Sequence, residues 1–148
     1  PIRKRLFTKA FYEKHFPELT KDRSKKLPDS GYPDMGEGQF SQKLSLDDWM
    51  TFGNAQRAHY NYIEGVASII SALAVSGLFF PRYTAILGVV YIVGRLVYAN
   101  GYRMAGARGR LPGALLIDFA LLGVIGGAFY GAFNFGGGVA GFMSLFKF

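Results

Sequence analysis

The stretch that decides the fold is "GVASIISALAVSGLFF", residues 65–80, which contains no charged side chain. Two further stretches, residues 83–102 and 113–135, are apolar over a similar length, and each is interrupted by a single charge, Arg95 in the first and Asp118 in the second. About 20 mainly apolar residues suffice for a helix to cross the hydrocarbon core of a bilayer. A backbone in lipid has to satisfy its own hydrogen bonds, which favours helices over open strands. The sequence therefore predicts an all-α integral membrane protein.

Start and stop signals place the bounds of the three helices. A hydroxyl followed by two acids, at Ser45, Asp47 and Asp48, is typical of a helix start, because the hydroxyl caps the helix and the acids face the positive end of its dipole. The turn "FPRY", residues 80–83, separates the first helix from the second, and "RMAGARGRLPG", residues 103–113, is a tight basic turn before the third. We expect a bundle of three transmembrane helices at about 45–80, 83–104 and 112–135.

The N-terminal part differs in composition from the rest of the chain. Residues 1–44 carry ten of the 17 Lys and Arg residues and lack a long apolar run. Within them, "IRKRLFTKAFYEKHF", residues 2–16, predicts an amphipathic helix on an anionic membrane surface or on a partner, with a mitochondrial-type targeting relic as the alternative. We expect a basic arm and loop at 1–44, one transmembrane domain at 45–135 and a Gly-rich tail at 136–148.

The distribution of charge predicts the topology. The arm and the turn at residues 103–113 bring ten plus three basic residues to one side of the membrane, whereas the other side receives Arg82 and Lys147. The positive-inside rule then places the arm on the cytosolic side of the endoplasmic reticulum, or on the matrix side of the mitochondrial inner membrane. The C-terminal two thirds offer no basic surface for nucleic acid. With no cysteine and no second histidine at metal-ligand spacing, we expect no metal site.

Polar side chains gather where the first two predicted helices end on the basic side. On each helix they are spaced three or four residues apart, so that each set occupies one face. Charged groups at this depth are costly unless they pair with one another or bind something. The set suits a small zwitterionic or peptide-like ligand, and an internal ion-pair network between helices is the alternative. Its members are Arg57, Asn61 and Glu64 on the first helix, Tyr98 and Tyr102 on the second, and Arg108 and Arg110 in the turn.

Two charges lie inside the second and third predicted helices. Arg95 is seven residues inward from Tyr102, and Asp118 is five residues inward from Gly113, so that the two side chains have compatible depths. An ion pair between the helices is the least costly arrangement for two charges in lipid. We therefore expect Arg95 and Asp118 to pair with each other.

Three segments carry a resemblance to a known family. "FGNAQRAHYNYIE" (52–64), "FPRYTAILGVVYIVGRLVYANGY" (80–102) and "RGRLPGALLIDFALLG" (108–123) resemble the MAPEG family of microsomal glutathione transferases and leukotriene synthases, above all its third-type microsomal glutathione transferase branch. The resemblance covers about two thirds of the chain. It implies that glutathione is a co-substrate and that an arginine of the turn, Arg110 or Arg108, stabilises its thiolate, since a cation near sulfur favours the reactive form. The glutathione-binding residues it implies are Arg57, Asn61, Glu64, Tyr98 and Tyr102.

The resemblance leaves two functions open. Members of the family have four membrane helices and form their site between the subunits of a trimer, whereas residues 1–22 contain no counterpart of the first helix. The first hypothesis is a homotrimeric membrane glutathione transferase or peroxidase that acts on lipophilic electrophiles or lipid hydroperoxides. The second is a non-catalytic, MAPEG-derived accessory subunit of a larger membrane complex, for example a mitochondrial respiratory assembly.

Overall fold

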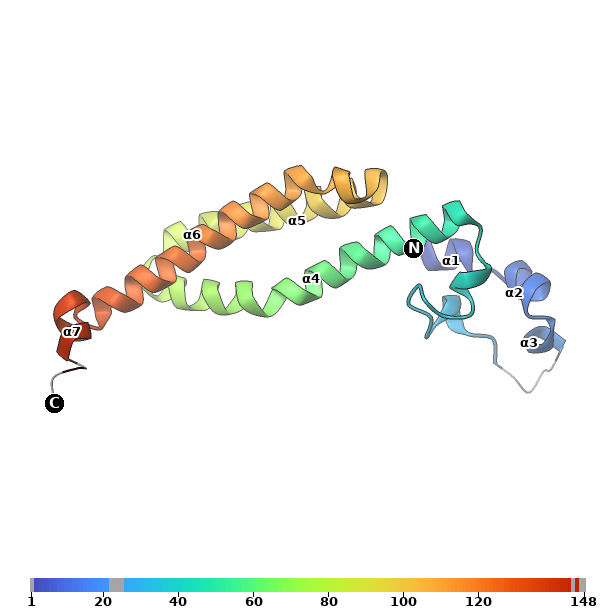
Figure 1. Ribbon diagram of the computed structural model, residues 1–148, viewed down its shortest axis with the longest axis horizontal. Coiled ribbons are helices and arrows are strands. Elements are labelled where there is room, and N and C mark those ends of the chain that lie inside the picture. Colours follow the sequence, from blue (N-terminus) through green and yellow to red (C-terminus); the bar gives the residue numbers. More distant parts are fainter. Residues whose placement is uncertain (1, 22–25, 145, 147–148) are drawn as a thin grey trace. The chain divides into compact units, whose positions relative to one another are not determined.

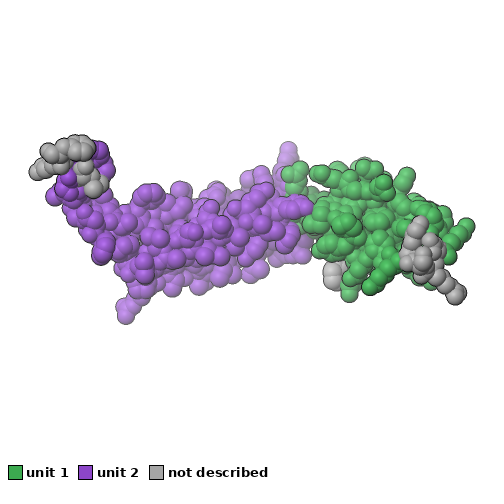
Figure 2. Space-filling model, turned by 90° about the horizontal axis from the view of Figure 1, so that it is seen from below, with its two compact units in different colours: residues 1–58 green, residues 59–148 purple. Residues whose placement is uncertain are grey.

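The computed structural model describes residues 2–21, 26–144 and 146, and every regular element within them is a helix (Figure 1). The chain divides into two compact units, residues 1–58 and 59–148, with the boundary inside a long helix (Figure 2). The α-helices are α1 (Ile2–Leu6), α2 (Lys9–His15), α3 (Pro17–Lys21), α4 (Leu46–Phe79), α5 (Pro81–Gly109), α6 (Leu111–Phe135) and α7 (Gly138–Ser144), and the 3-10 helices are η1 (Asp29–Gly31) and η2 (Ser41–Lys43).

Three of these helices are long and apolar enough to cross a membrane. They are α4, α5 and α6, with 34, 29 and 25 residues, judged by length and composition. Their bounds agree closely with the predicted helices at about 45–80, 83–104 and 112–135, so the prediction of an all-α fold with three membrane helices is confirmed. Lys147, which entered the predicted topology, lies outside the described residues.

Helices α5 and α6 form an antiparallel hairpin and lie side by side along most of their length (Figure 1). Glycines form the contact. A Cβ on Gly94 would lie only 2.9 Å from the Cβ of Leu116, and one on Gly113 would collide with the backbone of Tyr98. Small residues let helix backbones approach closely in a membrane, where packing rather than hydrophobic burial drives association. The glycines of this hairpin therefore hold its two helices close together.

The turn that joins α5 to α6 depends on glycine as well. The backbone leaves the helical conformation at Ala105 and at Gly106, whose φ of 61° and ψ of −146° are open in practice only to glycine. Gly101 and Gly109 approach so closely that a Cβ on either would collide with the carbonyl group of the other. The regular part of α5 therefore ends near residue 104, where the sequence predicts the end of the second helix.

Helix α4 reaches the hairpin mainly through side chains. The hydroxyl groups of Ser76 and Thr84 share a buried hydrogen bond of 2.8 Å near the α4–α5 turn. Ile69 is 3% exposed, whereas Leu78 on the same helix is 81% exposed. Only part of α4 thus packs within the described structure, and much of its apolar surface remains open.

The first unit has an aromatic core of its own. Phe7 and Phe52 meet edge to face, with ring centroids 5.4 Å apart. The apolar side chains of residues 2–16 turn into this core, which differs from the prediction that they lie on a membrane surface or on a partner. The buried members of the core are Leu6, Phe7, Tyr12, Phe16 and Phe52.

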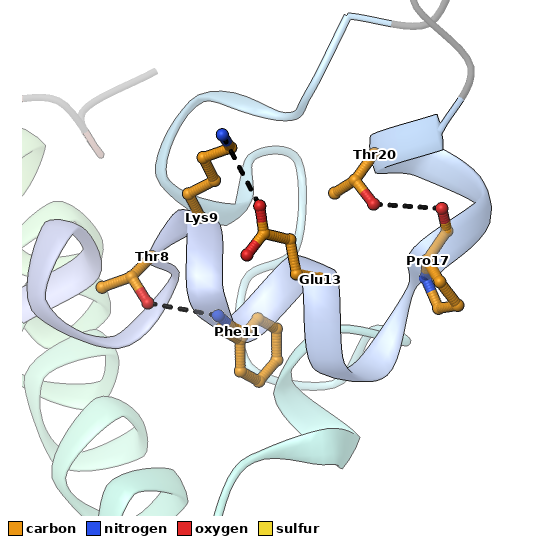
Figure 3. A network of polar contacts seen from close by, with 6 residues as sticks. All are labelled: Thr8, Lys9, Phe11, Glu13, Pro17 and Thr20. Carbon is orange, nitrogen blue, oxygen red and sulfur yellow. Dashed lines mark hydrogen bonds and ion pairs between the residues drawn. The ribbon is translucent and has the colours of Figure 1, made fainter.

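Residues 2–16 form two short helices instead of the single predicted one. The Thr8 hydroxyl accepts a hydrogen bond of 3.2 Å from the Phe11 amide and so caps the start of α2 (Figure 3). Lys9 and Glu13, one helical turn apart, form an exposed ion pair with a nitrogen–oxygen distance of 3.5 Å (Figure 3). The cap at Thr8 explains why the chain begins a new helix at that point.

The loop that precedes α4 is organised around the Asp34 carboxylate. Its oxygens accept hydrogen bonds from the amides of Gly36, Gly38 and Ser41 at 2.8, 3.1 and 2.7 Å, and from the Ser41 hydroxyl at 3.0 Å. Burial acts to raise the pKa of Asp34, but these hydrogen bonds to the ionised form outweigh it and lower the pKa. The segment is therefore an ordered loop held by one buried carboxylate.

Candidate functional site

One face of α5 carries a row of buried tyrosines. Tyr91, Tyr98 and Tyr102 are 7%, 7% and 9% exposed. The rings of Tyr98 and Tyr102 lie one turn apart, with centroids separated by 5.9 Å and planes tilted by 41°. The spacing of four residues places both phenols on the same side of the helix. The two tyrosines that the sequence singles out are therefore neighbours in the fold.

Arg110, between α5 and α6, completes this group. Its Nη1 donates a hydrogen bond of 3.4 Å to the Tyr98 hydroxyl, and its guanidinium carbon lies 5.7 Å from the centre of the Tyr102 ring. The hydrogen bond to Tyr98, together with the electrostatic effect of the Tyr98 and Tyr102 phenol groups, raises the pKa of Arg110 and outweighs the lowering by burial. Arg108, the other arginine proposed for the thiolate, is exposed. Of the two, Arg110 is the one that contacts both tyrosines.

Arg95 links α5 to α4. Its Nη2 donates a hydrogen bond of 2.7 Å to the backbone carbonyl of Asn61. Gly65 lies beside it, since a Cβ at that position would be in ordinary van der Waals contact with the same nitrogen, at 3.8 Å. Three aromatic faces surround the guanidinium, at 5.0, 5.6 and 5.8 Å from their ring centres, which are favourable cation–π distances. These rings belong to Tyr62, Tyr91 and Tyr98.

The predicted ion pair between Arg95 and Asp118 does not form. Among the described residues no ion pair joins the two side chains, and Asp118 is exposed on α6. The reason is the direction of the two side chains around their helices. Gly94 and Ile117 lie at the contact between α5 and α6. Arg95 and Asp118 each come one position after these contact residues, and one position turns a side chain by about 100° around the helix axis, away from the partner helix. Their depths match, as predicted, but their directions do not.

The remaining predicted residues lie on α4. Asn61 is half-buried and is joined to Arg95 through its carbonyl group. Glu64 is exposed one turn further along the same helix, and Arg57 is exposed one turn before Asn61. Within the unit 59–148, the structure thus connects Asn61 to the tyrosines of α5 by way of Arg95.

Two side chains of the cluster were not predicted as site residues. Tyr62 and Tyr91 both face the guanidinium of Arg95. Tyr91 carries a signal in the sequence, since it lies four residues before Arg95 and seven before Tyr98. Tyr62 carries none, because its position next to Asn61 does not reveal which way α4 faces. The arrangement as a whole presents two cations and several phenols along one side of α5, from Tyr91 near its middle to Arg110 at the α5–α6 turn.

Every regular element described is a helix, and three of the helices are long and apolar enough to cross a membrane. The protein is therefore an integral membrane protein. The model of the MAPEG family matches residues 17–130, which is most of the chain, and the protein belongs to that family. Members of the family generally use glutathione.

Comparison of the sequence with individual proteins finds a similar protein of uncharacterised function but no similar solved structure. An uncharacterised protein from Synechocystis sp. is 35% identical over 82 residues, an alignment that covers 50% of this chain and 60% of that protein. The chain therefore spans less than two thirds of this relative's length. No solved structure matches the sequence.

Proposed function

We propose that the protein is a membrane-bound glutathione transferase or peroxidase, of the third-type branch of its family, that acts on lipophilic electrophiles or lipid hydroperoxides. The observation that carries the proposal is the contact of Arg110 with both Tyr98 and Tyr102. It unites three of the residues that the family resemblance assigns to glutathione and its thiolate. Apolar substrates concentrate in the bilayer, so a site at the end of a membrane hairpin suits them.

Glutathione has two carboxylates, an amine, two amides and a thiol, and the candidate residues offer a partner for each kind of group. Arg57 matches a carboxylate, Glu64 the amine and Asn61 an amide. The phenols of α5 add hydrogen-bond donors and acceptors. The family's site lies between subunits of a trimer, so we propose a homotrimer in which a neighbouring subunit closes the site.

Arg110 is the residue that we assign to the chemistry. A guanidinium beside the sulfur lowers the pKa of the thiol and keeps the sulfur as thiolate. In the transferase reaction, the thiolate forms a carbon–sulfur bond with the electrophile while the leaving group departs. In the peroxidase reaction, the sulfur attacks a hydroperoxide oxygen and the alcohol is released; a second glutathione then converts the oxidised sulfur to the disulfide and yields water. Arg108 is the alternative residue for the same role.

Binding of glutathione is the direct test. The purified, lipid-reconstituted protein should bind glutathione in isothermal titration calorimetry, and Arg57→Ala should abolish the heat, because the variant lacks a cation for a carboxylate. Arg82→Ala is the matched control, since Arg82 is exposed in the first turn of α5, at the other end of that helix from Tyr98 and Tyr102. If the intact protein gives no measurable heat, the enzyme hypothesis fails.

A second candidate function is a non-catalytic subunit of a larger membrane assembly, such as a mitochondrial respiratory complex. The exposed charge of Asp118 on a membrane helix favours it, since such a charge calls for a partner. Native sizing after gentle detergent extraction separates the two candidates: a homotrimer supports the enzyme, and co-migration with many other chains supports the subunit. We propose the mitochondrial inner membrane or the endoplasmic reticulum as location, with the basic arm on the matrix or cytosolic side.

A further inference from the structure

The outer face of α6 repeats the pattern of its inner face. The inner face, which meets α5, has buried residues at Gly113, Ile117, Ala120 and Val124, spaced four, three and four apart. Such spacing is that of a helix packed lengthwise against another helix. A second row with the same alternation of four and three runs along the outside of the helix. Its members are Leu111, Leu115, Asp118, Leu122, Ile125, Phe129 and Ala132.

The outer row is exposed over most of its length. Leu111, Leu115, Leu122 and Phe129 are 58%, 71%, 70% and 75% exposed. Exposed apolar residues are ordinary on a helix in lipid, so the row alone indicates no partner. The exception is Asp118, which lies in the middle of the row and is also exposed.

Asp118 lies at a depth in the helix where surrounding lipid alone would not stabilise its carboxylate. It lies seven residues, or about 10 Å, inside the start of α6. It is the one acidic residue of the sequence after Glu64. A carboxylate at such depth is costly unless it faces a cation, a hydrogen-bonding partner or water. A cation or a hydrogen-bonding neighbour would therefore stabilise this side chain far better than lipid does.

The described residues do not supply that neighbour. Arg95 has the right depth, but its guanidinium is directed at the Asn61 carbonyl and three tyrosine rings on another side of the hairpin. The other basic residues described after residue 65 lie in the first turn of α5 or around the α5–α6 turn. A second copy would bring the same Arg95, held at the same carbonyl group and rings, and its other described arginines after residue 65 lie near helix ends instead of at the depth of Asp118. Charge complementarity therefore favours a different polypeptide.

The shape of the surface agrees with a helical partner. Two turns beyond Asp118, a groove of about 300 Å³ opens between α4 and α6, and its lining is almost entirely apolar. Ile125, Phe129 and Ala132 of the outer row form one wall of it. Alanines elsewhere in the lining allow a helix to approach closely. The groove is lined by Ser71, Ala72, Val75, Ile125, Ala128, Phe129 and Ala132.

We propose that the outer face of α6 docks a membrane-spanning helix of another polypeptide, which carries a lysine or arginine at the depth of Asp118 and extends into the groove between α4 and α6. The ion pair sets the register of the two helices, as a single polar residue does in a helical seam. This surface is separate from the Arg110–Tyr98–Tyr102 cluster, so the inference holds whether or not the proposed enzymatic activity does.

Synthetic transmembrane peptides provide the test. The full chain, labelled with a fluorescence donor, is reconstituted in phosphatidylcholine vesicles with acceptor-labelled Leu/Ala peptides that carry one lysine, or one leucine instead, at the depth of Asp118. Energy transfer should show the lysine peptide binding about tenfold more tightly than the leucine peptide, an effect typical of one polar contact between membrane helices. Asp118→Asn should remove this difference.

A charge exchange guards against a folding defect in that variant. The Asp118→Lys variant should no longer bind the lysine peptide preferentially and should instead bind a peptide with glutamate at the same position. A misfolded chain would not show this exchange of preference. Equal binding of the lysine and leucine peptides, or unchanged discrimination in Asp118→Asn, would overturn the proposal. A homo-oligomer that Asp118→Asn disperses would contradict it as well, because the occupant would then be a second copy.

Discussion

Helices α5 and α6 meet through glycines, whereas α4 reaches α5 through polar side chains. In the first contact, Gly94 and Gly113 bring the backbones together, and each leaves no room for a Cβ. In the second, Arg95 of α5 donates a hydrogen bond to the Asn61 carbonyl of α4, and the hydroxyl groups of Ser76 and Thr84 share a hydrogen bond. The α5–α6 contact is thus a close apolar seam, and the α4–α5 contact is a polar joint. Candidate ligand-binding groups lie near both: Asn61 at the joint, and Tyr98, Tyr102 and Arg110 where the seam ends at the α5–α6 turn.

The largest expected effect follows from a methyl group placed in the glycine seam. Gly113→Ala puts a Cβ into the backbone of Tyr98, so the hairpin has to open. We expect a loss of about 3 kcal/mol in the free energy of unfolding, the upper range for overpacking. Gly126→Ala on the same helix is the control, because its Cβ meets nothing within 4 Å. Denaturant titration in detergent measures both, and equal stability of the two variants would refute the close approach.

A smaller effect is expected at the polar joint. Arg95→Met keeps the length and apolar body of the side chain but removes the hydrogen bond to Asn61 and the cation–π contacts. We expect a loss of about 1–2 kcal/mol, because hydrogen bonds between membrane helices are individually modest. Hydrogen exchange should accelerate in α4 around residue 61 while the α5–α6 seam keeps its protection. Acceleration spread evenly over both regions would show that the seam and the joint are not separate.

The sequence predicts the fold well because the dominant forces leave simple marks. Long apolar runs define the membrane helices, and the glycines and basic residues at 103–113 mark the turn. The end of the second helix is placed correctly at 104, since Gly106 needs a conformation open only to glycine. Residues 2–16 were less predictable, because both a membrane surface and an internal aromatic core select for the same apolar face.

The candidate site is predictable in part. Tyr98 and Tyr102 are neighbours, as expected from helix spacing, whereas the sequence leaves open which of Arg108 and Arg110 joins them, and the fold brings Arg110 to both. The partner of Arg95 could not be predicted from the sequence, because a shift of one helical position decides whether a side chain points toward the neighbouring helix or about 100° away from it. Periodicity gives the depth of Arg95 and Asp118 correctly, but the contact between Gly94 and Ile117 sets their directions. That contact is a property of the packed hairpin.

The measurement closest to the central claim is the ultraviolet difference spectrum of glutathione bound to the reconstituted protein. If Arg110 with its tyrosines forms the chemical end of the site, the wild-type protein and Arg108→Ala should both show thiolate absorbance at neutral pH. Arg110→Ala should bind glutathione but leave it as the thiol. Thiolate that persists in Arg110→Ala and disappears in Arg108→Ala would contradict the account.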